Sequence, residues 1–339
     1  MDVSFSVDAV IAGTIYFETI INRNKQISLN TPGGSALYCA AGFRLWDKHP
    51  GILGKMSEDK SERWIHLFQS EGIDTSGIRK LRGAFDQDRF YAVLEDGRLT
   101  SESPQKYFFA LNQPLPKYLL GHEAPRVSQE INRAIQPESL SQDDISDEYL
   151  QVGHLVIAPC DLYTHLMLPP FYRFRTNGRI ILCGSSTFMQ PAFWYEFPPL
   201  LRGVEVFITT ENQLRRLFLG KNENIWEMIE FVTSTGVEMV LVYSNEEDHY
   251  LMDKSANAKY RIPNYPTNIV DPIGAFPAFC GGFSSPYITH FDPIESALAA
   301  SVTASIKKEG SGPLFLLQTL PELARARAES LRDQVQIVQ

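Results

Sequence analysis

Four short apolar segments in the second half of the chain limit its possible folds more than any other feature. They are HLVIAP (154–159), GRIILCG (178–184), VEVFITT (204–210) and VEMVLVY (237–243). Each is apolar nearly throughout, as expected of a strand buried on both faces, and helical stretches separate them. Strands that alternate with helices predict an α/β fold with a parallel sheet covered on both faces. In such sheets, ligands bind beyond the carboxyl ends of the strands.

The first half of the chain predicts one more strand of this kind and then extended structure. VDAVIAG (7–13) is typical of a buried strand that ends at a glycine. Residues 14–30 alternate enough to be extended, and RFYAVLEDGRLTSE (89–102) predicts a hairpin that turns at Asp96-Gly97. TPGGSALYCAAGFRLW (31–46) runs from a Pro-Gly-Gly turn into a helix with small residues on one face. We expect residues 1–339 to form a single domain.

Residues 103–150 differ in composition from the rest of the chain. They contain five prolines and an acidic patch: Pro104, Pro114, Pro116, Pro125, Pro137, Asp143, Asp144, Asp147 and Glu148. Prolines at this density disfavour regular helices and central strands. We therefore predict an irregular acidic insertion at the surface, over about residues 103–150, and not a second domain.

Composition and charge exclude some partners. The chain has 339 residues, a hydrophobic content of 44% and a net charge of −9. This acidity argues against nonspecific binding to nucleic acid or to an anionic membrane. No stretch approaches ~20 apolar residues, and no basic leader begins the chain, so neither a membrane span nor a signal peptide is expected. The cysteines are widely spaced, which favours buried free thiols in a cytoplasmic protein: Cys39, Cys160, Cys183 and Cys280.

The stretch VDPIGAFPAFCGGF (270–283) carries a family likeness. It resembles the C-terminal signature VDxTGAGDAFxGGF of the ribokinase-like, or PfkB, carbohydrate kinases. GIDTSGI (72–78) and PGGSALYCAAGFRLW (32–46) resemble two further motifs of this family, in the family's order. The resemblance implies a ribokinase-like, doubly wound α/β fold: a mostly parallel sheet with helices on both faces and a small β lid. The lid would come from about residues 14–30 and 85–102.

The resemblance also implies a chemistry, in which the γ-phosphate of ATP passes to a hydroxymethyl group with the help of magnesium. The family's signature loop supplies an anion hole at a helix start, and its aspartate takes the proton of the hydroxyl. Gly274 and Ala275 match the start of the anion hole, but Phe276 replaces its second glycine. Pro277 stands at the position of the catalytic aspartate and cannot accept a proton. Proline suits the first residue of a helix, so a structural role there is expected.

The family's magnesium and nucleotide motifs are also altered. The two diagnostic positions of its NxxE motif fall on Thr210 and Gln213, which are uncharged and so poor ligands for a hard cation. Its TxGxxG stretch falls on residues 243–248, where Tyr243, Asn245 and Asp248 replace the small residues. Close approach of a phosphate to that backbone is disfavoured.

On the sugar side, the resemblance places the substrate cleft at Glu18, Gly33, Gly34 and Tyr38. The glycines keep the family pattern. Glu18 takes the place of an aspartate and can still bind a hydroxyl group, whereas Tyr38 replaces an asparagine and fills space that a sugar would need.

These joint departures lead to the expectation of a ribokinase-like protein without kinase activity, which acts as a binding, regulatory or scaffold protein. No cofactor and no metal are then expected. Such a protein would bind a protein partner or form a homodimer through the lid. It could also bind a small molecule in the old sugar cleft. The alternative is an active sugar or nucleoside kinase that uses ATP and magnesium with a relocated base, either Glu18 or Asp271 through water. A turn or cap role is the more economical interpretation of Asp271.

Overall fold

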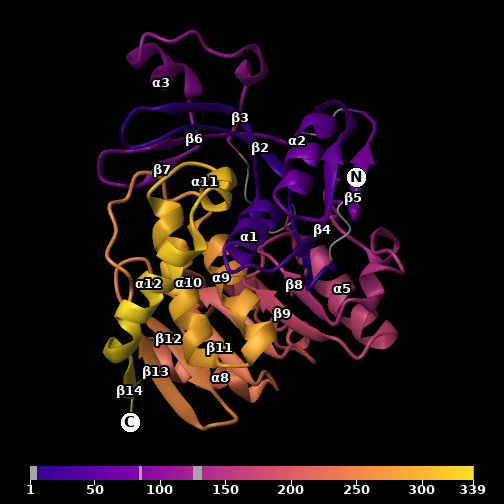
Figure 1. Cartoon of the computed structure of the whole chain (residues 1–339), viewed down its shortest axis with the longest axis vertical. Helices are drawn as coiled ribbons and strands as arrows, with labels where there is room; N and C mark the ends of the chain where they lie inside the picture. Colours follow the sequence, from indigo (N-terminus) through magenta and orange to yellow (C-terminus); the bar gives the residue numbers. More distant parts are fainter. Residues whose placement is uncertain (1–5, 84–85, 125–131, 339) are drawn as a thin grey trace.

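The computed structural model describes residues 6–83, 86–124 and 132–338 (Figure 1). Its main element is a ten-stranded sheet with the order β14-β13-β12-β11-β10-β9-β8-β1-β4-β5. The seven strands from β11 to β5 run parallel to their neighbours, and the pairs from β11 to β14 are antiparallel. The strands span β1 Ala9–Ala12, β4 Pro50–Ser57, β5 Ile78–Leu81, β8 His154–Ile157, β9 Arg179–Cys183, β10 Val206–Thr210, β11 Met239–Tyr243, β12 His249–Asp253, β13 Ala258–Ile262 and β14 Gln336–Val338.

Helices cover both faces of this sheet, because alternate strand residues face opposite cores. In β1, Ile11 belongs to one core and Val10 to the other. On the first face lie α1 Ser35–Arg44, α9 Ala275–His290, α10 Pro293–Lys308, α11 Pro313–Leu317 and α12 Pro321–Leu331. On the second face lie α5 Leu162–Arg175, α6 Phe197–Leu200, α7 Glu211–Leu217 and α8 Ile225–Ser234. Helix α2, Glu58–Ser70, packs beside β4 and β5.

Helices α1 and α9 pack at very close range. A Cβ atom on Gly281 would overlap the carbonyl oxygen of Cys39, and one on Gly42 would overlap that of Ala278. The Cys280-Gly281-Gly282 patch therefore serves helix packing. All four cysteines are buried and free, as the sequence predicted.

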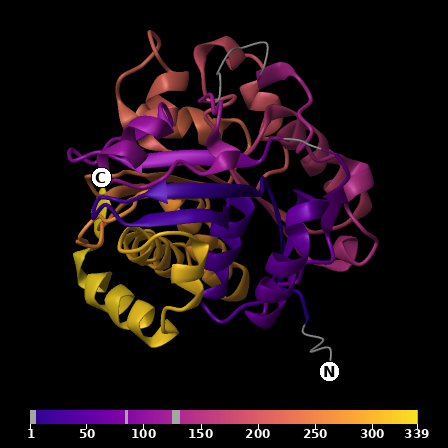
Figure 2. The same ribbon diagram turned by 90° about the horizontal axis from the view of Figure 1, so that it is seen from above.

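A second, four-stranded sheet lies across the carboxyl end of the main sheet. Its order is β3-β2-β6-β7, with β2 Tyr16–Ile21, β3 Ile27–Gly33, β6 Asp88–Val93 and β7 Leu99–Thr100. Seen from above, its strands cross over the end of the helical layer (Figure 2). The N–H group of Arg23 donates to the carbonyl oxygen of Val270, which ties this sheet to the loop before α9. Strands β2, β6 and β7 fall within the predicted lid segments, whereas β3 runs past the first of them to Gly33.

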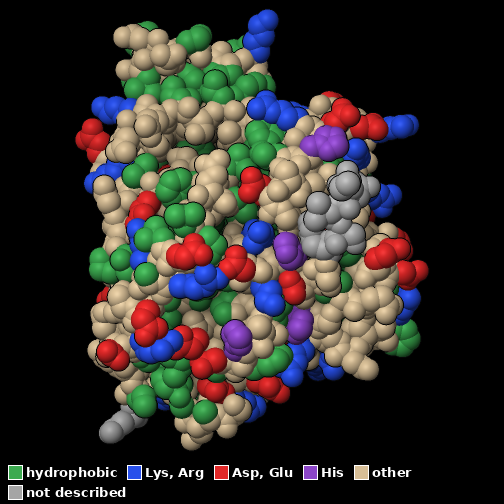
Figure 3. Space-filling model, in the orientation of Figure 1, with side chains coloured by type: hydrophobic (Ala, Val, Ile, Leu, Met, Phe, Trp, Pro, Cys, Tyr) green, Lys and Arg blue, Asp and Glu red, His purple; other side chains and the backbone are tan. Residues whose placement is uncertain are grey.

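The segment after the lid sheet holds short helices: α3 Pro104–Ala110 and the 3-10 helices Lys117–Leu119, Gln142–Asp144 and Tyr149–Gln151. Figure 3 shows hydrophobic side chains at this end of the molecule, where Phe109 and Leu120 are exposed. Asp144, in contrast, has a buried side chain that pairs with Lys55 at 3.2 Å and with Arg79 at 3.0 Å. Residues 84–85 and 125–131, inside the predicted lid and insertion, lie outside the described residues.

The predicted fold class is confirmed, because the sheet is mostly parallel, both of its faces are covered and a small β lid is present. One local expectation was wrong. Helix α9 begins at Ala275, so Pro277 is its third residue and not its first. The N–H of a third residue still has no partner within the helix, so proline remains compatible with this turn.

In the described part of the chain, no helix is long and apolar enough to cross a membrane.

Candidate functional site

The N-terminus of α9 lies at the carboxyl end of the parallel strands, beneath the lid. Gly274 precedes it with a φ of 77°, a conformation that side chains other than glycine rarely adopt. A Cβ atom there would also overlap the ring of Tyr38. Two constraints therefore require glycine at position 274, and both persist although the aspartate of the signature is gone.

The first turn of α9 offers few donors to an anion. The N–H of Ala275 donates to the carbonyl oxygen of Pro272 at 3.2 Å, and that of Ala278 donates to Gly274 at 3.0 Å. Pro277 has no N–H. Among the described residues, only the N–H of Phe276 in this turn is left without an acceptor. A typical helix start offers about four free N–H groups, so the backbone anion hole is much reduced.

Asp271 and Lys307 form a fully buried ion pair below this turn. The Lys307 ammonium lies 3.5 Å from Oδ2 of Asp271, and both side chains have an exposed fraction of 0%. The same ammonium donates to the carbonyl oxygens of Gly310, at 2.8 Å, and of Asp271 itself, at 3.3 Å. Asp271 Oδ1 accepts the N–H of Ile273 at 2.9 Å, which is a turn contact of the kind expected from the sequence. The loop before α9 is therefore held by a buried cation.

Glu18 places a second buried carboxyl group on the lid side. Its strand, β2, carries a bulge between Glu18 and Ile20, and bulges redirect side chains. Oε1 of Glu18 accepts the N–H of Gly34 at 3.0 Å, and Oε2 accepts the hydroxyl of Tyr38 at 2.6 Å. The carboxyl group fills the space where a Cβ of Gly33 would lie. The structure thus brings together Glu18, Gly33, Gly34 and Tyr38, and the Tyr38 ring connects them to Gly274.

Burial raises the pKa of Glu18 from 4.5 to about 7, because a charged carboxylate loses its hydration there. The hydrogen bonds from Tyr38 and Gly34 and the charge of Lys307 oppose this shift, while Asp271 adds to it. Burial also raises the pKa of Tyr38 well above its ordinary value, so its hydroxyl stays protonated. A carboxyl group with a pKa near neutrality is suited to general acid–base chemistry.

Thr210 and Gln213 do not fit a magnesium ion. Oε1 of Gln213 accepts the N–H of Thr210 at 3.1 Å and the hydroxyl of Thr209 at 3.0 Å. The Thr210 hydroxyl in turn accepts the N–H of Gln213, which completes a capping box at the start of α7. Neither side chain carries a negative charge. Among the described residues, no group of three or more His, Cys, Asp or Glu could hold a metal ion.

The positions matched to the nucleotide motif lie at the hairpin between β11 and β12. Asn245 is exposed, and Oδ2 of Asp248 lies 3.8 Å from Nε of Arg261. Tyr243 is different: it is buried at the end of β11 and its ring stacks on His249 at 5.3 Å. Its ring also lies 5.9 Å from that of Phe276 in α9. The structure therefore keeps Tyr243 beside the helix start and places Asn245 at the surface.

Sequence reasoning missed two lysines at this end of the sheet. Lys307 and Lys308 close α10 and are both buried, with exposed fractions of 0% and 3%. The signal that could have drawn attention to them is a Lys-Lys pair at the end of the apolar run SALAASVTASI (296–306). His249 is also buried, and no described residue bonds to its Nε2.

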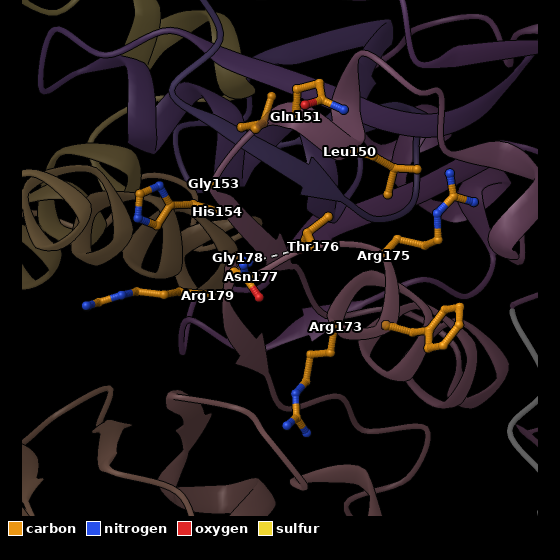
Figure 4. A pocket seen from close by; sticks show the side chains of 12 residues that line it. Leu150, Gln151, Gly153, His154, Arg173, Arg175, Thr176, Asn177, Gly178 and Arg179 are labelled. Atoms are coloured by element: carbon orange, nitrogen blue, oxygen red, sulfur yellow. Dashed lines mark hydrogen bonds between the residues drawn. The ribbon is translucent and has the colours of Figure 1, made fainter.

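A cavity of about 540 Å³ lies at the opposite end of the strands, away from α9 and the lid (Figure 4). It is lined by residues 150–154 and 173–179, at the amino ends of β8 and β9. Arg175 and Arg179 are half exposed and already pair with Asp147 and Glu205. Because ligands of α/β sheets bind at the carboxyl ends of strands, we do not assign the site to this cavity.

The fold is ribokinase-like. A putative ribokinase II from E. coli superposes with a TM-score of 0.71 at 15% identity, over 96% of this chain and 100% of that one. The adenosine kinase of Sinorhizobium meliloti does so with a TM-score of 0.69 at 16% identity, over 96% and 100%. Residues 175–320 match the family model of the pfkB family carbohydrate kinases. A cytidine kinase of Thermococcus kodakarensis is 21% identical over 286 residues, which are 83% of this chain and 88% of that protein.

These relatives correct the functional expectation. The sequence departures predicted a non-catalytic binding, regulatory or scaffold protein. That prediction was wrong, because the proteins that match over most of the chain are named as sugar or nucleoside kinases. The alternative, an active kinase with a relocated base, agrees better with them. The predicted lid-mediated dimer and protein partner stay predictions.

Proposed function

We propose that this chain is an ATP-dependent kinase that phosphorylates an alcohol group of a nucleoside or a sugar. The cytidine kinase named above supports a nucleoside as the first acceptor to test. In the reaction, the alcohol oxygen forms a bond to the γ-phosphorus of ATP, the bond from that phosphorus to the β-phosphate oxygen breaks, and ADP leaves. The proton of the alcohol must pass to a base. Catalysis of this step depends mainly on positioning and on charge stabilisation.

The observation that carries the proposal is the hydrogen bond between Tyr38 and Glu18. The Tyr38 hydroxyl is itself an alcohol, held 2.6 Å from Oε2 of Glu18, and its ring packs on Gly274 at the start of α9. A substrate alcohol that takes the place of this hydroxyl would have both a carboxylate and the helix start beside it. Glu18, with a pKa of about 7, then accepts its proton.

Asp271 is the less suitable base. Its carboxylate is paired with Lys307 and accepts the N–H of Ile273, and its exposed fraction is 0%. We therefore assign Asp271 to holding the loop before α9. Because residues 210 and 213 do not fit a magnesium ion, we derive no step from a protein-bound metal.

The experiment that tests the proposal measures ADP formation by the full chain with ATP and a panel of acceptors, with cytidine, adenosine and ribose first. The matched variants are Glu18→Gln and Asp271→Asn. The amide of Glu18→Gln keeps the shape of the carboxylate without titrating: its oxygen can accept the N–H of Gly34, and its NH2 group can donate to the oxygen of Tyr38. We expect Glu18→Gln to lower kcat by about 10²–10⁴-fold, the usual effect of losing a positioned base. Equal losses in both variants would contradict the assignment of Glu18 as the base.

A further inference from the structure

Lys308 has a largely buried side chain, and its ammonium group faces no opposite charge in the described part of the chain. Lys308 has an exposed fraction of 3%, and its side chain makes no ion pair and no hydrogen bond with any described residue. The neighbouring Lys307 is also buried, but its ammonium group forms an ion pair with Asp271. Burial lowers the pKa of Lys308 from 10.5 to about 8, and no nearby carboxylate opposes this shift. Lysines with so little exposed surface are normally paired. The Lys308 ammonium nitrogen is not among the buried atoms cut off from solvent, so an anion from solution can reach this unpaired charge.

The known neighbours of the Lys308 ammonium group are aromatic. Its Nζ lies 5.4 Å from the centre of the Tyr243 ring, and Tyr243 stacks on His249. Nδ1 of His249 accepts the N–H of Ser244 at 3.1 Å, so Nε2 carries the hydrogen, and this buried donor has no partner among the described residues. Burial and the charge of Lys308 together lower the pKa of His249 to about 3, so its ring is neutral. An ammonium and an N–H donor thus lie close together, and both need an acceptor.

This cluster borders the start of α9. The carbonyl oxygen of Lys308 accepts the N–H groups of Val270 and Asp271, at 2.8 and 3.0 Å, in the loop that leads into the helix. The Tyr243 ring, over which Lys308 lies, is 5.9 Å from the ring of Phe276. Lys308 therefore lies between the carboxyl end of β11 and the first turn of α9. That turn lacks one N–H donor because residue 277 is a proline.

We propose that Lys308 is a phosphate-binding residue, whose ammonium group holds the polyphosphate of the nucleotide in place of the lost backbone donors. This inference rests on the proposed function, because it names the group that binds the nucleotide of the kinase. A lysine is a suitable replacement, since it acts on phosphate as a point charge and needs no fixed backbone geometry.

The test uses inorganic tripolyphosphate as the probe, with calorimetric titration of the full chain. The variants are Lys308→Met, which removes the charge at similar length, Lys308→Arg, which keeps it, and Lys254→Met. Lys254 is exposed in the turn between β12 and β13 and provides the matched loss of one charge. We expect Lys308→Met to weaken binding by about 10- to 100-fold, the range for a charge-assisted hydrogen bond. Lys254→Met should stay within about twofold of the wild type, and Lys308→Arg within about fivefold.

A second measurement keeps the proposal falsifiable if Lys308→Met does not fold. Wild-type affinity for tripolyphosphate should fall between about pH 7 and about pH 10, because Lys308 loses its proton in this range. Among its titratable neighbours, His249 is neutral and burial raises the pKa of Tyr243. Burial lowers the pKa of Lys307 as well, so the titration is repeated with Lys308→Arg, whose guanidinium stays charged and should remove most of the fall in affinity.

No binding by the wild type, an affinity that does not fall with pH, or equal effects of Lys308→Met and Lys254→Met would overturn the inference. Failure of the proposed function is seen separately. If no acceptor gives ADP while tripolyphosphate still binds through Lys308, the kinase assignment falls and the phosphate site stands. If turnover is found but Lys308→Met binds ATP and tripolyphosphate like the wild type, the kinase assignment stands and the Lys308 phosphate site is disproved.

Discussion

The ammonium of Lys307 lies 3.5 Å from Oδ2 of Asp271, and neither side chain reaches solvent. The pair fixes the loop between the lid and α9, because the same ammonium also binds the carbonyl oxygens of Asp271 and Gly310. It thus links the last turn of α10 to the loop that leads into α9. The candidate site is built on this link, with Glu18 and Tyr38 on the lid side and Lys308 on the strand side.

Removing one partner of this pair should destabilise the protein strongly. We predict that Lys307→Met lowers the free energy of unfolding by about 3–5 kcal/mol, because the Asp271 carboxylate is left buried without a counter-charge. The double variant Lys307→Met with Asp271→Asn should recover part of this loss, since no charge then remains buried. Urea unfolding of the two variants and the wild type gives the comparison. Equal losses in the single and double variants would show that packing, and not charge, accounts for the effect.

Gly274 should tolerate no side chain, for two separable reasons. Gly274→Ala places a Cβ at a φ of 77° and against the Tyr38 ring, whereas Gly312 has the same φ with nothing within 4 Å. We predict that Gly312→Ala costs about 1 kcal/mol from backbone strain alone. Gly274→Ala should cost about 1–3 kcal/mol more, from the overlap with Tyr38. Urea denaturation measures both changes, and equal costs would disprove the close contact.

The stability of the protein should depend on the protonation of Glu18. Its pKa is about 7 in the folded chain and 4.5 in the reference state, so the folded protein favours the protonated form. This contribution is fully present below about pH 4.5 and is lost as pH rises through about 7. Glu18→Gln, which cannot titrate, should therefore be more stable than the wild type by about 1–3 kcal/mol above pH 7. The difference should shrink towards pH 4.5, as followed by thermal melting at several pH values.

Restoring an aspartate at the helix start should raise turnover. In the variant Phe276→Gly with Pro277→Asp, the first turn of α9 regains a carboxylate and an N–H donor. We expect kcat to rise at least about tenfold, towards the 10²–10⁴-fold typical of a positioned base. If Glu18 is the base of the wild type, Glu18→Gln should then cost less in this background than in the wild type. An unchanged kcat would show that proton transfer does not limit the reaction.

The sheet and helices could be predicted because strands such as VEVFITT and VEMVLVY are apolar on both faces, which a parallel sheet requires. The Thr210–Gln213 capping box could also have been predicted, since T-x-x-Q before an apolar helix is its usual signature. The role of Tyr38 was only partly foreseen: its bulk was noted, but its bond to Glu18 and its contact with Gly274 depend on how the lid meets α1.

Lys307 and Lys308 could not be predicted as site residues. A lysine pair at the end of a helix usually means solvated charges that interact favourably with the helix dipole. Here the packing of α10 against α9 and α1 buries both. That packing joins segments far apart in the sequence, so no local pattern reports it. The reduced anion hole was visible in the sequence at Phe276 and Pro277, whereas the nearby positive charge was not.

The central claim is that this chain transfers phosphate although Pro277 replaces the family's aspartate. The most direct measurement is acceptor-dependent ADP formation by the wild type and by Glu18→Gln, with cytidine as the first acceptor and the pH varied across 7. The account predicts turnover whose kcat/KM rises as Glu18 loses its proton near pH 7, and a loss of about 10²–10⁴-fold in Glu18→Gln. A folded wild-type protein that forms no ADP with any nucleoside or sugar would contradict it.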